Sequence, residues 1–295
     1  MYTTLISAAQ LQALIAAGQP CMIFDCSFDL MKPEAGLQQY LHSHIPGALH
    51  ADLNTALSSQ HDPVGTPSSQ TADAPASGGR HPLPSRARFA AWLSSVGFRR
   101  DMQAVVYDRH GANYCGRLWW MLKWAGHEAV AVLDGGLQAW QATGAALSAG
   151  QEGQASPGDF VLAEPLVRLV DAGSVVAELG RPGQTLIDAR AVPRFKGEVE
   201  PLDPVAGHIP GALNRPFSQN LGPDGLFKPA VQLRQEFEEL LGLRSPGSVV
   251  HHCGSGVSAL PNLLAMEIAG LGRTALYAGS WSDWCSDPAR PVAQG

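Results

Sequence analysis

The sequence is poor in the features that mark nucleic-acid-binding, membrane and secreted proteins. Only 16% of its 295 residues are charged, and 26 acidic against 20 basic residues give a net charge of −6. Without runs of Lys or Arg, there is no reason to expect nucleic acid or an anionic membrane as a partner. No apolar stretch approaches the length of a membrane span, and the first residues lack the basic and apolar regions of a secretory signal.

Cysteine is also scarce. The chain has five, an odd number, at widely scattered positions: Cys21, Cys26, Cys115, Cys253 and Cys285. None belongs to a C-x-x-C pair, so the pattern indicates neither a disulfide framework nor a zinc site. A reduced protein of the cytoplasm is the simplest interpretation.

Four features recur in the same order in the two halves of the chain. They are an apolar strand ending in Asp, the motif HIPGAL, a second apolar strand, and a glycine-bearing turn followed by Trp. They lie at 22–25, 44–49, 105–108 and 134–140, and again at 186–188, 208–213, 249–253 and 278–284. Such a repeat indicates a tandem duplication.

The two copies differ in length between HIPGAL and the next strand. Matching positions lie 164 residues apart at His44 and His208, but 145 apart at Asp108 and Cys253. The extra residues of the first copy fall in 54–84, whose Ser, Pro, Gly and Ala content predicts an irregular loop. Such a loop could cover the cleft of the other domain. We expect domains at 1–145 and 161–295, joined by a polar linker at 146–160.

Within each copy, apolar runs alternate with helix-like segments. Residues 115–124 and 258–269 both carry apolar side chains at helical spacing. Alternating strands and helices predict an α/β fold of two similar domains, each a parallel sheet flanked by helices. In such sheets, functional residues gather at the carboxyl ends of the strands.

The segment VVHHCGSGVS at 249–258 is typical of a strand, a turn and a helix start, with Cys253 in the turn. Backbone N–H groups at a helix start converge on anions, and Gly254 and Gly256 permit a tight loop. This setting stabilises a thiolate, the nucleophilic form of cysteine. The other four cysteines lack such a loop, and we expect them to serve packing.

A cysteine in a strand-to-helix turn also occurs in cysteine-dependent phosphatases. Those enzymes place an arginine at the sixth position after the cysteine, where it binds phosphoryl oxygens. Here that position is Ala259. Phosphoryl transfer would lack its main charge stabiliser, and the sequence excludes this chemistry.

With the repeated HIPGA motif, the LDGG…W segment and the cysteine loop, the chain resembles the tandem rhodanese-type sulfurtransferases over both halves. CGSGVS is similar to the loop of the 3-mercaptopyruvate branch and departs from it at Ser258. The resemblance implies that Cys253 takes sulfur from a small anionic donor, 3-mercaptopyruvate, as a persulfide and releases pyruvate. A thiol such as thioredoxin, or cyanide, would accept the sulfur, with no cofactor. The first copy, with Asp108 at the cysteine position, would be inactive.

The resemblance also implies roles for particular residues. Arg194, supported by Arg190, would bind the donor carboxylate. Relatives usually carry a second arginine before the second HIPGA, but there is none between Arg194 and His208. The loop residues Gly254, Gly256, Val257 and Ser258 would complete the donor site. Ser255 would relay a proton with His44 as its partner, and Glu34 is the nearest acidic residue before His44.

Two alternatives remain open for the reaction. The donor could be thiosulfate, or the chain could be a relay module that receives persulfide from a partner desulfurase. His251 and His252 precede Cys253, but adjacent strand residues point to opposite faces. With no fourth ligand in the pattern, we expect no metal site.

Overall fold

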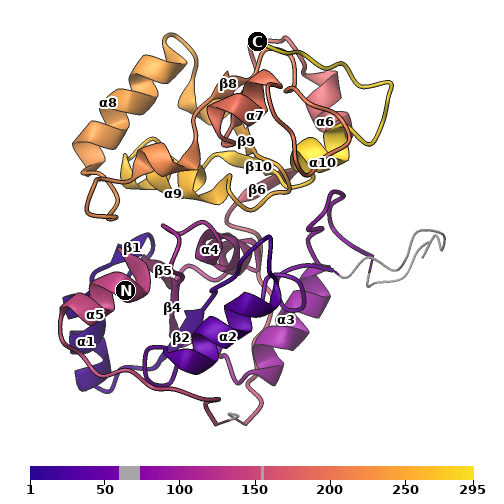
Figure 1. Cartoon of the computed structure of the whole chain (residues 1–295). Helices are drawn as coiled ribbons and strands as arrows, with labels where there is room; N and C mark the ends of the chain where they lie inside the picture. The colour runs from indigo at the N-terminus through magenta and orange to yellow at the C-terminus, as the bar shows by residue number, and fades with distance from the viewer. Residues whose placement is uncertain (60–73, 154–155) are drawn as a thin grey trace. The chain divides into compact units, whose positions relative to one another are not determined.

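The computed structural model describes residues 1–59, 74–153 and 156–295, and the chain divides into two compact units (Figure 1). The first unit consists of residues 1–76, 84–166 and 224–226. The second consists of residues 77–83, 167–223 and 227–295. The second unit therefore includes a short segment from the first half of the chain.

The segments predicted as a loop and as a linker lie at the ends of the described ranges. The predicted irregular loop at 54–84 falls partly at 60–73, outside the described residues. The predicted linker at 146–160 forms part of the first unit. Ser148 pairs with His44 in an isolated antiparallel bridge, and the Gly158 N–H donates to the Ser94 carbonyl at 2.7 Å. Residues 154–155 of this segment are not described.

The first unit is built on a five-stranded sheet in the order β1-β5-β4-β2-β3, with parallel neighbours throughout. Its strands are β1 (Leu5–Ile6), β2 (Cys21–Asp25), β3 (Leu49–His50), β4 (Gln103–Tyr107) and β5 (Val130–Leu133). Its helices are α1 (Ala8–Ala16), α2 (Glu34–His42), α3 (Arg86–Ser95), α4 (Cys115–Trp124) and α5 (Gly136–Ala142).

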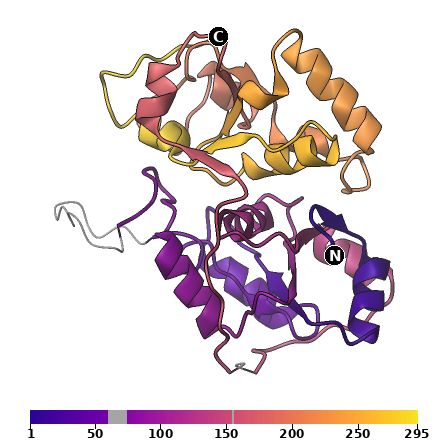
Figure 2. The same cartoon turned by 180° about the vertical axis from the view of Figure 1, so that it is seen from behind.

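Helices cover both faces of this sheet, and side chains alternate between the two buried faces along each strand. Ile23 and Val105 pack with Leu11 of α1 and Trp140 of α5 in one core cluster. Phe24 points to the opposite face, where its ring lies 5.8 Å from that of Trp92 in α3. In Figure 1, α1 and α5 lie together, and Figure 2 shows the same unit from behind.

The second unit repeats this architecture in the strand order β6-β10-β9-β7-β8, again with parallel neighbours. Its strands are β6 (Arg168–Val170), β7 (Thr185–Asp188), β8 (Leu213–Asn214), β9 (Val249–His252) and β10 (Ala275–Tyr277). Its α-helices are α6 (Ala172–Ala177), α7 (Val192–Lys196), α8 (Ala230–Leu241), α9 (Leu260–Ile268) and α10 (Ser280–Trp284). Two 3-10 turns, η1 (Phe217–Asn220) and η2 (Pro246–Ser248), complete it.

The core of the second unit is also divided by its sheet. Val250 packs on one face with Val175 of α6 and Trp281 of α10. On the other face, His251 Nε2 lies 3.2 Å from the Met266 sulfur in α9. The predicted α/β fold with two similar parallel-sheet domains is confirmed. None of the helices in the described parts of the chain has the length and apolar character needed to cross a membrane.

Candidate functional site

Cys253 directly follows β9, at the carboxyl end of a central strand, and only 1% of it is exposed. The start of α10 holds it in place. The Cys253 N–H donates to Ser280 Oγ at 3.1 Å, and its carbonyl accepts from the Trp281 N–H at 2.9 Å. Ser280 has a positive φ of 57°, an uncommon conformation for serine. This conformation keeps its hydroxyl 4.0 Å from Cys253 Sγ.

The loop after Cys253 bends tightly because Gly256 adopts a φ of 73°. A Cβ at this position would overlap the carbonyl oxygen of Ala278. Val257 is buried and Ser258 half-buried, and Pro261 lies in the first turn of α9 as its missing N–H permits. That Gly254, Gly256, Val257 and Ser258 bind the donor stays a prediction.

The equivalent loop of the first unit shows what this backbone can bind. Asp108 takes the place of Cys253. Its carboxylate accepts four backbone N–H bonds of 2.8–3.1 Å, from His110, Ala112, Tyr114 and Cys115. The loop therefore concentrates N–H groups on an anionic side chain, which is the property inferred for the cysteine loop.

Ser255 in the cysteine loop contacts a histidine that the sequence did not single out. His81 Nδ1 lies 2.7 Å from Ser255 Oγ, and both residues are buried. His81 belongs to the short segment 77–83 of the second unit. This segment is anchored where the Arg80 N–H donates to Ser282 Oγ at 3.0 Å. The α10 helix thus fixes both the cysteine loop and the segment that carries His81.

The predicted partner of Ser255, His44, is bound elsewhere, within the first unit. Its Nδ1 donates to the Tyr40 carbonyl at 2.8 Å, and its Nε2 lies 3.1 Å from a Glu152 oxygen. The acidic partner is therefore Glu152 and not Glu34. In the second unit, His208 bonds in the same way to the carbonyl of Phe195. Each histidine also stacks on an aromatic ring, with ring centroids 4.2 Å apart for His44 and 3.8 Å apart for His208.

This repetition bears on the predicted role of His44, and its pairing with Ser255 stays a prediction. Both HIPGA histidines bond the main chain of their own unit and stack on the residue they bond, and this parallel favours a structural role. The histidine that contacts Ser255 is His81. No local pattern predicts it. The only signal in the sequence is that His81 lies in the stretch that the first copy has in excess of the second.

Arg190, predicted to support substrate binding, is engaged with carboxylates. It bonds Asp188 through Nε and Nη2 and Glu200 through Nη1, with its side chain 2% exposed. It also lies over the ring of Trp281 at 4.8 Å. Burial would raise the pKa of Asp188, but His252 and Arg190 together hold that pKa below its usual value. These contacts hold the Arg190 guanidinium in place, and its support of substrate binding stays a prediction.

Arg194 lies in α7 and is more open, with its side chain 19% exposed. It bonds Glu200 at 2.6 Å and Asp203 at 3.3 Å through Nη2. Its guanidinium faces the cysteine loop, with Nη1 3.5 Å from the point where a Cβ on Gly254 would lie. That Arg194 binds substrate stays a prediction, and its position beside the loop is suited to that role.

The two histidines before Cys253 are fully buried on opposite faces of the sheet. Burial lowers the pKa of both, and that of His251 falls to about 3. His252 Nδ1 lies 3.9 Å from Asp188 Oδ2. Among residues 1–59, 74–153 and 156–295, no group of three His, Cys, Asp or Glu is arranged to hold a metal ion.

The remaining four cysteines lie outside the loop that follows β9. Burial raises the pKa of each, and for Cys26 and Cys115 the nearby Asp108 carboxylate raises it further. A raised pKa disfavours the reactive thiolate. This agrees with the packing role expected for these four residues.

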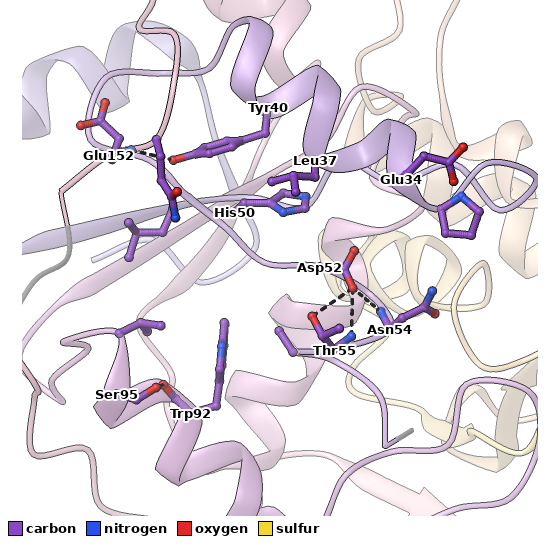
Figure 3. A pocket seen from close by; sticks show the side chains of 15 residues that line it. Glu34, Leu37, Tyr40, His50, Asp52, Asn54, Thr55, Trp92, Ser95 and Glu152 are labelled. Carbon is purple, nitrogen blue, oxygen red and sulfur yellow. Dashed lines mark hydrogen bonds between the residues drawn. The ribbon is translucent and has the colours of Figure 1, made fainter. Parts of the chain in front are cut away.

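A cavity of about 680 Å³ lies in the first unit (Figure 3). Tyr40, His50 and Trp92 supply its aromatic surface, with Glu34 and Glu152 at its edges. Two of its carboxylates already accept hydrogen bonds from the protein backbone. Figure 3 shows the Asp52 carboxylate bonded to the turn that follows it, and Glu152 accepts from the Gly47 N–H at 2.9 Å.

The repeated fold is reflected in the comparison with known families. The Rhodanese-like domain family matches residues 7–143 and 171–287. The chain therefore belongs to this family, in two tandem copies.

Full-length relatives refine this assignment. The chain is 47% identical to the "Probable 3-mercaptopyruvate sulfurtransferase" of Pseudomonas aeruginosa, over 99% of this chain and 98% of that one. It is 40% identical to the "Putative thiosulfate sulfurtransferase SseB" of Mycobacterium tuberculosis, over 99% and 97%. The crystal structure of SseA from Escherichia coli, a 3-mercaptopyruvate sulfotransferase by its description, is similar with a TM-score of 0.77 and 31% identity. That match covers 95% of this chain and 100% of SseA.

Proposed function

We propose that the protein is a sulfurtransferase that moves sulfur from 3-mercaptopyruvate to a thiol through a persulfide on Cys253. The observation that carries the proposal is the grouping around one loop of the second unit. Cys253 begins the loop, Ser255 is bonded to His81, and the Arg194 guanidinium faces Gly254. The near full-length similarity to a relative named for this reaction supports the choice of donor.

In the first half-reaction, the Cys253 thiolate attacks the donor sulfur, and a sulfur–sulfur bond forms. The carbon–sulfur bond of the donor breaks, and its electron pair passes to carbon as the enolate of pyruvate. Ser255 takes the donor thiol proton while passing its own to His81, which returns a proton to the enolate carbon. A serine hydroxyl alone is a poor base, and the 2.7 Å contact with His81 supplies the base it needs.

In the second half-reaction, an acceptor thiolate attacks the outer sulfur of the persulfide. The bond to Cys253 breaks and the thiolate is restored. A dithiol protein such as thioredoxin suits this step, because its second thiol can release the transferred sulfur as hydrogen sulfide. All five cysteines are free in the structure, and a reducing cytoplasmic setting would keep Cys253 available for this step.

A second donor, thiosulfate, deserves a direct comparison because the mycobacterial relative is named for it. Thiosulfate is a dianion, and thiosulfate-using loops generally carry basic side chains immediately after the cysteine. Here those positions are Gly254, Ser255 and Gly256. The neutral loop favours the monoanionic donor.

The test measures kcat/KM for both donors with cyanide as acceptor, following thiocyanate and, for 3-mercaptopyruvate, pyruvate. We expect 3-mercaptopyruvate to be preferred and thiocyanate to equal pyruvate. A preference for thiosulfate would reassign the donor. Negligible turnover of both, with persulfide gained only from a partner desulfurase, would indicate a relay module.

A further inference from the structure

We infer that Arg80 is a donor-binding residue that works with Arg194 to hold the carboxylate of the sulfur donor. The inference rests on the proposed function and adds a specificity-determining residue to it. From the point where a Cβ on Gly254 would lie, Arg80 Nη2 is 3.2 Å away and Arg194 Nη1 3.5 Å. Two guanidinium groups from distant segments thus converge on the residue that follows the nucleophile, and that residue has no side chain.

The hydrogen bond of the Arg80 guanidinium is made by Nη1, whereas the atom that faces Gly254 is Nη2. Its Nη1 pairs with Asp203, whereas its Nε is buried without a hydrogen-bond partner among the residues that the structure describes. Buried donors of this kind are uncommon in folded proteins and call for an explanation such as a ligand. The side chain is 29% exposed, so a small anion from solvent can reach it.

Asp203 shows that a carboxylate fits between the two guanidinium groups. One of its oxygens pairs with Arg80, and the other lies 3.3 Å from Arg194 Nη2. Its side chain is only 3% exposed, which fixes this arrangement. The two arginines are therefore held at the spacing of one carboxylate, with further donors directed toward the cysteine loop. Arg190 is not equivalent, because Asp188 and Glu200 engage it.

Arg80 also links binding to proton transfer, since its neighbour in the chain is His81. The donor has its thiol and its carboxylate on either side of a carbonyl carbon. A carboxylate held beside Gly254 places the thiol close to Cys253, one residue earlier, and to Ser255, one residue later. Arg80 thus favours donors with a carboxylate at this distance over donors without one.

The experiment compares 3-mercaptopyruvate with 1-mercaptopropan-2-one, which has the same thiol and ketone but lacks the carboxylate. For Arg80→Gln, we expect KM for 3-mercaptopyruvate to rise at least about tenfold with kcat little changed. The kcat/KM for the neutral donor should stay as in the wild type. Arg80→Lys should recover part of the loss. Arg181→Gln, which removes an exposed arginine of the second unit, is the matched control and should leave both donors unaffected.

An equal loss with both donors would overturn the inference, since it would mean that Arg80 only holds His81 in place. Unchanged kinetics with both would overturn it as well. Protection of Cys253 from iodoacetamide by pyruvate, measured in the same variants, requires no turnover. It therefore tests Arg80 even if 3-mercaptopyruvate proves not to be the donor: the Gln variant should need at least about tenfold more pyruvate. Equal protection would contradict carboxylate binding.

Discussion

The two units carry the same loop after the same central strand, but they differ in the side chain that the loop surrounds. In the first unit, the Asp108 carboxylate satisfies four N–H groups of the loop by itself. In the second, Cys253 occupies that position and presents a sulfur atom instead. One residue thus separates a loop that is complete in itself from one that can stabilise a thiolate or a persulfide.

The two loops also differ at the residue that follows Asp108 or Cys253. In the first unit, Arg109 follows Asp108 and bonds Asp25 at 3.0 Å. In the second, Gly254 follows Cys253, and the corresponding Asp188 is paired by Arg190 instead. With its arginine at the end of β7 instead of in the loop, the second unit has no side chain at the residue after the nucleophile, and Arg80 and Arg194 face that residue. Duplication therefore kept one loop as a structural element and made the other available for chemistry.

The largest predicted effect on activity concerns the two histidines that could act as the base for Ser255. His81→Ala removes the partner of Ser255, and we expect kcat/KM to fall by about 10²–10⁴-fold. His44→Ala removes bonds within the first unit, so the free energy of unfolding should fall by about 1–3 kcal/mol while kcat of the folded protein stays close to wild type. Steady-state kinetics with urea unfolding separates the two.

His81→Gln tests whether the alanine variant loses activity only because it is misfolded. Glutamine keeps a polar side chain of similar length but cannot act as a base. It should lose activity like the alanine variant while retaining the wild-type unfolding curve. If His44→Ala instead abolished turnover in a folded protein, the structural assignment of the HIPGA histidines would be wrong.

The closed loop of the first unit should be a source of stability. Asp108→Ala leaves four N–H groups without their acceptor, and we expect a loss of about 3 kcal/mol in unfolding free energy. Activity of the folded fraction should persist. Asp101→Ala, which removes an exposed carboxylate, is the control and should leave the urea midpoint unchanged. A change as small for Asp108 as for Asp101 would mean that water replaces the carboxylate in the loop.

A smaller effect should distinguish the strands that lead into the two loops. His251 lies where the first unit has Val106, and burial lowers its pKa to about 3. The unfolded chain takes up a proton near pH 6.5 that the folded state refuses. Stability is therefore complete above pH 6.5 and lost as pH falls toward 3, by up to about 1.4 kcal/mol per pH unit.

His251→Val should make this dependence shallower between pH 7 and 4.5, measured by urea unfolding at each pH. The exposed His42 offers the matched control, because His42→Asn should keep the wild-type slope. An unchanged slope in His251→Val would show that the acid sensitivity of the second unit lies elsewhere, with His252 the first residue to test.

The sequence predicted the features that depend on local pattern. The helix at 115–124 has the predicted bounds in α4, and the strand at 249–253 becomes β9 followed by Cys253. Arg80 and His81 escaped prediction because they lie in an aperiodic segment whose position depends on the tertiary fold. For His44, the motif does not reveal whether the imidazole bonds the main chain or a distant hydroxyl, and the structure shows its bond to the Tyr40 carbonyl.

The central claim is that sulfur is carried on Cys253 of the second unit and nowhere in the first. Intact mass measured after incubation with 3-mercaptopyruvate, without acceptor, tests it most directly. The wild type should gain one sulfur atom, lose it again on addition of cyanide, and release one pyruvate per chain. Cys253→Ser should gain none. Sulfur retained by the serine variant, on any of the other four cysteines, would contradict the account.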